Sequence, residues 1–218
     1  MKRLMFITVV CAFVAVPAWA DLTPIGTPSQ PEPQLLVGTD PILQHLYGAG
    51  NFARIDDRPF PGDQLWMNLD GGATAEAKWA GATESFGYIA GSSGGSFVKL
   101  FGPIVSSTNG YLSGYSGTTP DHATMPIFRL ALSAVNFGVR SSQESDNSGK
   151  DNMVTWLITG GTSAGHYVVG WEAESLGDAD YQDLVVEISG AVPVPAPAAI
   201  VLGILGLGVA GWKLRRFA

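Results

Sequence analysis

The residues best suited to chemistry are five acids crowded into twelve positions of one segment: Glu172, Glu174, Asp178, Asp180 and Asp183. Two apolar, β-branched runs flank them, so the acids belong to a connection between two buried strands. Carboxylates this close repel each other by about 1 kcal/mol per pair even in a solvated loop. A cation bound among them would reverse that repulsion.

Calcium fits this spacing. It takes six to eight oxygen ligands at about 2.3–2.6 Å, and an Asp-x-Asp segment supplies carboxylates and carbonyls from one loop. Tyr181 is expected to turn into the core, so that Asp183 can close the loop. We therefore predict a calcium site formed by Glu172, Asp178, Asp180 and Asp183. The alternative is a solvated acidic loop without an ion.

Other polar clusters are less regular. The segment "ESDNSGKDN" (144–152) lacks the spacing of an EF-hand, and is interpreted either as a second ion site or as a turn. The segment "IDDRPFPGD" (55–63) is interpreted as a charged loop. His45, His122 and His166 lie far apart in the sequence, which does not favour zinc or copper.

Catalytic patterns do not select a site. "GTSAG" (161–165) fits the nucleophile elbow, but that elbow needs a helix after it, and a strand-like segment follows here. It therefore predicts a hairpin turn. Glycoside hydrolysis needs a pair of carboxylates. The nineteen acids allow many such pairs, and no pattern in the sequence identifies one of them as catalytic. We predict that the protein is not an enzyme.

Tryptophans on strand-like segments leave a second function open. Trp66, Trp79, Trp156 and Trp171 would stack on sugar rings if they were exposed on one face, or form the core if they were buried. The alternative function is therefore a carbohydrate-binding module, with exopolysaccharide as the partner.

The elements that position these residues are mostly strands. One helix is expected in "TDPILQHLYGAG" (39–50), capped by Thr39 or Asp40 and ended by Gly48. Eight strands are expected at 64–69, 73–80, 85–90, 96–101, 127–139, 152–159, 166–172 and 183–189. This pattern predicts an all-β domain over residues 39–190, an antiparallel β-sandwich of jelly-roll type.

The N-terminal end predicts export. Residues 1–20 have a basic start, a short apolar stretch and a small-x-small cleavage site, which together indicate a signal peptide cut by signal peptidase. Residues 21–38 are proline-rich and form an extended lead-in. Between the two ends, seven Lys and Arg stand against nineteen Asp and Glu, a net charge of −12, which argues against nucleic-acid binding.

The C-terminal end combines a Pro-rich linker (191–197), an uncharged apolar run that starts at residue 198, and a basic tail ending at residue 218. Fifteen apolar residues (198–212) span roughly 22 Å as a helix, and the cations would stay on the cytoplasmic side. This end resembles the PEP-CTERM sorting signal of Gram-negative bacteria, with Val192, Pro193, Pro195 and Ala196 in the V-P-x-P-A motif. The resemblance implies a transmembrane helix in the inner membrane, processing by an exosortase, and delivery to the cell surface or matrix.

The acidic segment carries a second resemblance. "VGWEAESLGDADYQDLVVEI" resembles the signature F-E-D…D-x-D-[FY]-x-D-[LIV]-V of a bacterial β-sandwich module known as domain of unknown function 4114. Glu172, Asp178, Asp180, Tyr181 and Asp183 match it, while Trp171 and Ala173 depart from it. The resemblance implies a calcium-associated sandwich in surface proteins, without established catalysis. The expected function is thus an adhesive or structural module stabilised by calcium.

Overall fold

The computed structural model describes residues 41–55, 65–119, 121, 123, 125–174 and 180–194. The predicted signal peptide, the lead-in at 21–38 and the predicted transmembrane helix at 198–218 lie outside these residues. Among the residues that are described, no helix is both long enough and apolar enough to cross a membrane.

The described chain contains one α-helix, α1 (Ile42–Tyr47), a short 3₁₀ helix, η1 (Glu144–Asn147), and eleven strands. The strands are β1 (Phe52–Ile55), β2 (Trp66–Lys78), β3 (Glu84–Ala90), β4 (Phe97–Ile104), β5 (Gly110–Tyr111), β6 (Ser116–Thr118), β7 (Ile127–Ala134), β8 (Gly138–Ser141), β9 (Met153–Ile158), β10 (Tyr167–Trp171) and β11 (Leu184–Pro193). Every recorded strand pairing is antiparallel. The prediction of an all-β fold with one short helix is confirmed.

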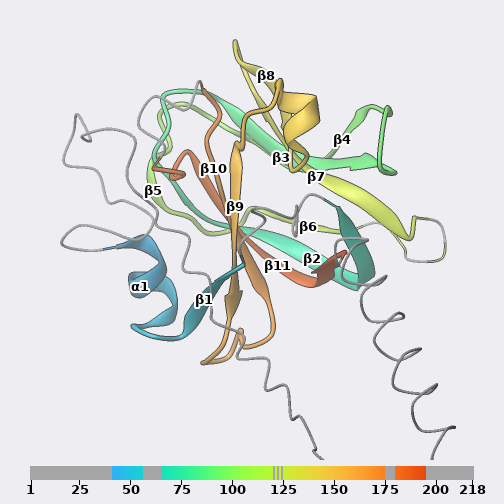
Figure 1. The fold of residues 1–218 in the computed structure, drawn as a ribbon. Coiled ribbons are helices and arrows are strands. Elements are labelled where there is room, and N and C mark those ends of the chain that lie inside the picture. Colours follow the sequence, from blue (N-terminus) through green and yellow to red (C-terminus); the bar gives the residue numbers. More distant parts are fainter. Residues whose placement is uncertain are drawn as a thin grey trace, which may run out of the picture.

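The strands form one sheet in the order β1-β9-β10-β11-β2-β7-β3-β4, with β5 and β6 pairing with β2 and β8 with β7. This sheet curls strongly. Phe86 on β3 and Trp171 on β10 are four strand positions apart, which would separate them by roughly 19 Å in a flat sheet. Their ring centroids are only 6.2 Å apart, so the two halves of the sheet face each other across a core (Figure 1).

Apolar side chains lie on both faces of β9, β10 and β11, and on β2 the outer cluster includes Ala77. The inner cluster lies between the two halves of the sheet and includes Trp66, Phe86 and Trp171. The outer cluster places Ile42 and Leu43 of α1 against side chains such as Trp156 and Val185. The helix therefore covers the outer face of the sheet, beside β1 at the lower left of the view (Figure 1).

Helix α1 begins after Pro41, which occupies the N-cap with no side-chain hydrogen bond, and ends at Gly48, whose φ is 81°. The predicted stop at Gly48 is confirmed, since glycine adopts this left-handed region without steric cost. The N-cap is therefore Pro41 and not the predicted Thr39 or Asp40, which lie outside the described residues.

Two strand predictions differ from the structure. The expected strands at 64–69 and 73–80 are one strand, β2, because Gly71 and Gly72 continue it. A Cβ on Gly71 would lie 1.9 Å from the Ser189 carbonyl oxygen, so this glycine permits close approach of β11 and does not mark a turn. The expected strand at 127–139 is instead two strands, β7 and β8, joined by a turn in which Asn136 has a φ of 76°.

The boundary predicted between the domain and the linker also differs. Ala191, Val192 and Pro193 were assigned to the linker, but they complete β11 and pair with Asn68, Met67 and Trp66 of β2. The sheet therefore includes the first two residues of the predicted sorting motif. Pro195 and Ala196 of that motif lie outside the described residues.

Candidate functional site

A bulge in β2 decides which side chains reach the inner core. Val186 pairs with Ala75 and Val185 with Ala77, so Glu76 is an extra residue on the β2 side. Ala75 belongs to the inner cluster and Ala77 to the outer one. Because side chains alternate along a strand, the next residue, Lys78, turns inward and is completely buried.

A buried acid faces the same region from the other half of the sheet. Glu84 begins β3 two residues before Phe86 of the inner cluster, so the two side chains share a face. Glu84 is 0% exposed, and neither of its carboxylate oxygens has a hydrogen-bond partner among the described residues. Burial, together with the charge of Asp183, raises the pKa of Glu84 to about 9, and Lys78 opposes this rise.

Lys78 and Asp183 complete this group. The Lys78 ammonium donates a 2.7 Å hydrogen bond to the Ala80 carbonyl, and burial lowers its pKa against the attraction of Glu84 and Asp183. Asp183 Oδ2 accepts a 2.6 Å hydrogen bond from the Ala173 amide. Asp183 thus joins the end of β10 to the start of β11 beside two fully buried ionisable side chains, Lys78 and Glu84.

The other predicted calcium ligands lie around this connection. Glu172 is buried directly after β10, and its amide donates to the Asn152 carbonyl at 2.9 Å. Asp180 is partly buried and accepts a 2.7 Å hydrogen bond from the Gln182 amide group. Asp178 lies outside the described residues. Within the described ranges, no three His, Cys, Asp or Glu side chains are placed to hold a metal ion, so calcium stays a prediction.

Tyr181 lies in the core, as expected. It is 8% exposed, has a φ of 54°, and donates a 2.9 Å hydrogen bond to the Asp151 carbonyl. The carbonyl of the following residue, Gln182, accepts a 3.1 Å hydrogen bond from the Trp79 amide, which fixes this connection beside the end of β2.

The second acidic loop is a turn that neutralises a buried cation. Arg129 on β7 is 1% exposed and donates to Asp146 in η1 and to the carbonyls of Gly91 and Gly94. Ser141 also donates to Asp146, at 2.6 Å. Since Arg129 already supplies the positive charge, the arrangement favours the turn over the second ion site.

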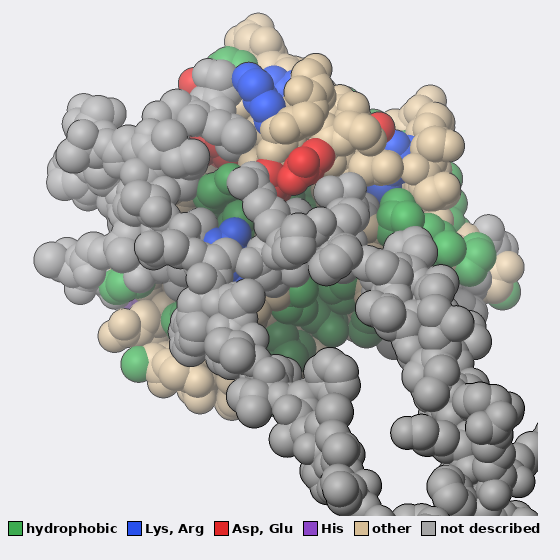
Figure 2. Space-filling view, in the orientation of Figure 1, with side chains coloured by type: hydrophobic (Ala, Val, Ile, Leu, Met, Phe, Trp, Pro, Cys, Tyr) green, Lys and Arg blue, Asp and Glu red, His purple; other side chains and the backbone are tan. Residues whose placement is uncertain are grey.

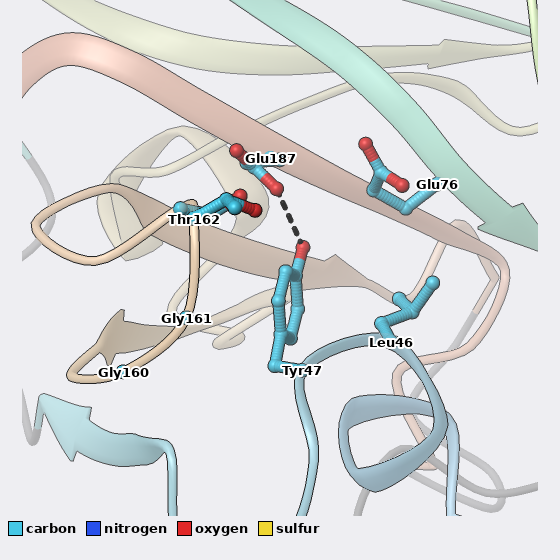
Figure 3. Close-up of a pocket in the computed structure, with 8 residues that line it drawn as sticks. Leu46, Tyr47, Glu76, Gly160, Gly161, Thr162 and Glu187 are labelled. Atoms are coloured by element: carbon cyan, nitrogen blue, oxygen red, sulfur yellow. Dashed lines mark hydrogen bonds between the residues drawn. The ribbon is translucent and has the colours of Figure 1, made fainter.

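A pocket lies on the outer face of the sheet. It has a volume of about 380 Å³ and is lined by Leu46 and Tyr47 of α1, Glu76 of β2, Glu187 of β11 and residues 160–163 of the β9–β10 hairpin (Figure 3). The motif "GTSAG" forms this hairpin turn, as predicted, closed by a 2.9 Å hydrogen bond from the Gly165 amide to Ile158. The sequence did not predict the pocket.

Two glutamates give the pocket its electrostatic character. Tyr47 donates a 3.1 Å hydrogen bond to Glu187 Oε2, and His166 Nδ1 lies 2.6 Å from Glu187 Oε1. Burial and the charge of Glu187 raise the pKa of Glu76 to about 7. Burial and the two acids also raise the pKa of Tyr47, so its hydroxyl remains a donor.

The tryptophans do not form an exposed face. Trp66, Trp156 and Trp171 are at most 2% exposed and belong to the two clusters of the core. Trp79 is partly buried and packs edge-on against Tyr111, which stacks on His45. The interpretation of these residues as core is confirmed for the three buried rings.

Acidic side chains appear only in small separate groups on the face shown in Figure 2, with hydrophobic side chains visible between them. No family model, no curated protein and no solved structure matches this chain.

Proposed function

We propose that the protein is an exported, non-catalytic module of the cell surface or extracellular matrix, with calcium stabilising the connection between β10 and β11. The ligands would be Glu172, Asp178, Asp180 and Asp183. The role is adhesive or structural, and the curled sheet would be a β-sandwich of jelly-roll type. The predicted ends support the route: signal peptidase would cut after residue 20, and the C-terminal helix would anchor the chain in the inner membrane until an exosortase processes it.

The observation that carries this proposal is the carboxyl of Glu84. It is fully buried, close enough to Asp183 for that charge to raise its pKa, and without a hydrogen-bond partner in the described chain. A buried polar group without a partner costs about 1–3 kcal/mol. A hard dication beside Asp183 would satisfy these oxygens and displace the proton that Glu84 holds, in competition with the buried Lys78, whose ammonium is attracted to the same two acids.

A thermal melt of the purified protein in excess EDTA and then in millimolar calcium tests the proposal. A site filled to 100 times its dissociation constant adds about 2.7 kcal/mol to the free energy of unfolding, which raises Tm by several degrees. An Asp178→Ala, Asp180→Ala double variant should lose this rise. Asp121→Asn, a change at an exposed acid elsewhere, should keep it. Equal Tm values in EDTA and calcium would contradict the calcium site.

Glu84→Gln separates the buried acid from the loop. Glutamine is neutral and of similar shape, so in EDTA the variant should be as stable as the parent protein or more stable. In calcium its gain in Tm should be smaller than that of the parent protein. If Glu84→Gln keeps the full gain, the calcium ligands lie in the loop alone.

A carbohydrate-binding module is the second candidate function. The buried tryptophans do not support it, but the polar pocket between α1 and the β9–β10 hairpin does. Binding of exopolysaccharide in this pocket is compatible with the structural role, because the pocket and the acidic connection use different residues.

A further inference from the structure

We propose that the pocket between α1, β2, β11 and the β9–β10 hairpin binds an amino-sugar residue, with the sugar ammonium at Glu76. This inference rests on the second candidate function, sugar binding, and is independent of the calcium site. Three observations support it: which lining groups already have hydrogen-bond partners in the protein, the charge of the lining, and the shape of the part of the pocket rim that the β9–β10 hairpin forms.

Glu187 lines the pocket, and two side-chain contacts hold its carboxylate in place. Its Oε2 accepts from the Tyr47 hydroxyl at 3.1 Å, and its Oε1 lies 2.6 Å from His166 Nδ1. Both oxygens are therefore held by side chains of the protein. Glu76 projects from the neighbouring strand, at the bulge that turns it to the outer face, and its carboxylate lies across the pocket from the Tyr47 ring (Figure 3).

The charge of the lining selects the ligand. The described residues that line the pocket include two carboxylates and neither lysine nor arginine. An anionic ligand would be repelled, whereas a ligand with an ammonium group would neutralise two acids that repel each other. Burial raises the pKa of Glu76 to about 7, and the charge of Glu187 adds to this rise.

Hydroxyl groups on the opposite rim favour a ring over a linear amine. Thr162 and Ser163 of the hairpin line the same pocket as Tyr47 and the two glutamates. Hydrogen-bonding groups thus come from several directions, as a ring with an ammonium and several hydroxyls requires. The volume of about 380 Å³ lies in the usual range for small-molecule sites, about 300–1,000 Å³.

Two glycines shape the part of the pocket rim that the β9–β10 hairpin forms. A Cβ on Gly160 would lie 2.3 Å from Asn51 Oδ1, so a larger residue at this position would force the Asn51 side chain or the hairpin to shift. Gly161 has a φ of 75°, and a Cβ there would meet no atom within 4 Å. The rim is therefore open to solvent above Gly161, which gives a residue within a polysaccharide chain room to enter.

Calorimetric titration of the purified full chain in EDTA tests the proposal, with three oligosaccharides of equal length: a glucosamine oligomer, an N-acetylglucosamine oligomer and a glucan. The glucosamine oligomer should bind, and the two neutral oligomers should bind at least about tenfold more weakly, because a charge-assisted hydrogen bond is lost. Glu76→Gln should remove this preference, while the control Asp121→Asn should keep it. Thr162→Val should weaken binding of the glucosamine oligomer, which gives a second variant away from the sheet.

Three outcomes would overturn the inference. Equal binding of all three oligomers would refute the ammonium site but leave the sugar-binding function standing. Binding of none of them would refute both. Equal affinity for a simple linear diamine and for the glucosamine oligomer would show that the pocket recognises the charge alone. Because EDTA is present throughout, none of these outcomes depends on the calcium proposal.

Discussion

The Tyr47 hydroxyl at the end of α1 donates a hydrogen bond of 3.1 Å to Glu187 on β11, 140 positions further along the chain. This bond joins the first described element to the last one. The ring of Tyr47 also packs against the outer cluster of the core. The same residue therefore docks the helix and forms one wall of the pocket.

Removing the Tyr47 hydroxyl should loosen this docking. We expect Tyr47→Phe to lower the free energy of unfolding by about 1.5 kcal/mol, because a hydrogen bond to a charged acceptor is lost while the ring remains. Urea denaturation at neutral pH measures the change. Tyr88→Phe is the matched control, since Tyr88 contacts Phe128 through its ring and that contact survives the substitution. Equal losses in the two variants would show that the bond to Glu187 contributes nothing specific.

The raised pKa of Glu76 predicts a pH dependence of stability. The folded-state pKa, about 7, lies above the ordinary value of 4.5, so between these values the folded chain holds a proton that the unfolded chain has released. Stability should therefore fall as pH rises from about 4.5 to 7, by about 1–2 kcal/mol after allowance for partial exposure. Glu76→Gln should lack this part of the decline, while the part due to the raised pKa of Glu84 remains, and it should be more stable than the parent protein at pH 8.

Urea denaturation of both proteins at pH 5 and pH 8 measures this difference. The parent protein and Glu76→Gln should differ little at pH 5 and clearly at pH 8. Asp121→Asn controls for the loss of one acid at an exposed position. A stability difference between the parent protein and Glu76→Gln that stays constant with pH would contradict the raised pKa.

The fold class can be predicted from local sequence patterns, but several strand bounds and pairings cannot. Aromatic and β-branched runs predicted β3, β9 and β10 close to their observed bounds, and they predicted the start but not the end of β4 and β11, while Gly48 predicted the end of α1. The strands β1, β5 and β6 were missed because they are only two to four residues long and gain their partners from distant segments. Gly71 led to a wrong prediction, a break between two strands, for a similar reason. The close approach of β11 that requires a glycine at this position is seen only in the packed structure.

The acidic connection could be predicted from spacing, but the buried pair Lys78 and Glu84 could not. In a regular strand, Lys78 would lie on the opposite face from Ala73 and Ala75, toward the outside. The bulge at Glu76 reverses this alternation, and its position depends on the pairing between β2 and β11. A sequence pattern shows neither that pairing nor the pocket, which needs residues from four elements.

Arg129 offers a test of the turn at η1. Arg129→Met should lower the free energy of unfolding by about 3 kcal/mol, because it leaves Asp146 and the carbonyls of Gly91 and Gly94 without their buried donor. Lys99→Met, a change at an exposed cation on β4, should have little effect. Asp146→Asn should cost less than Arg129→Met and leave any calcium-dependent gain in Tm unchanged. Loss of that gain would instead identify η1 as an ion site.

The last residues of β11 predict where the stable domain ends. Val192 and Pro193 pair with Met67 and Trp66, and the Val194 amide donates a 2.7 Å hydrogen bond to the Leu65 carbonyl. A chain that ends at residue 190 would lose these bonds and expose the buried Trp66. It should be less stable by about 2–4 kcal/mol than a chain that ends at residue 194, at about 1 kcal/mol per backbone hydrogen bond plus the lost apolar burial.

Thermal melts of the two fragments, both starting at residue 21, measure this difference, with a fragment that ends at residue 197 as the control. The fragments ending at 194 and 197 should melt together, and the fragment ending at 190 should melt several degrees lower. Equal Tm values for all three would show that the end of β11 adds no stability. With the predicted order, a protease that cuts within the predicted sorting motif must act beyond Pro193, or else must first separate β11 from β2.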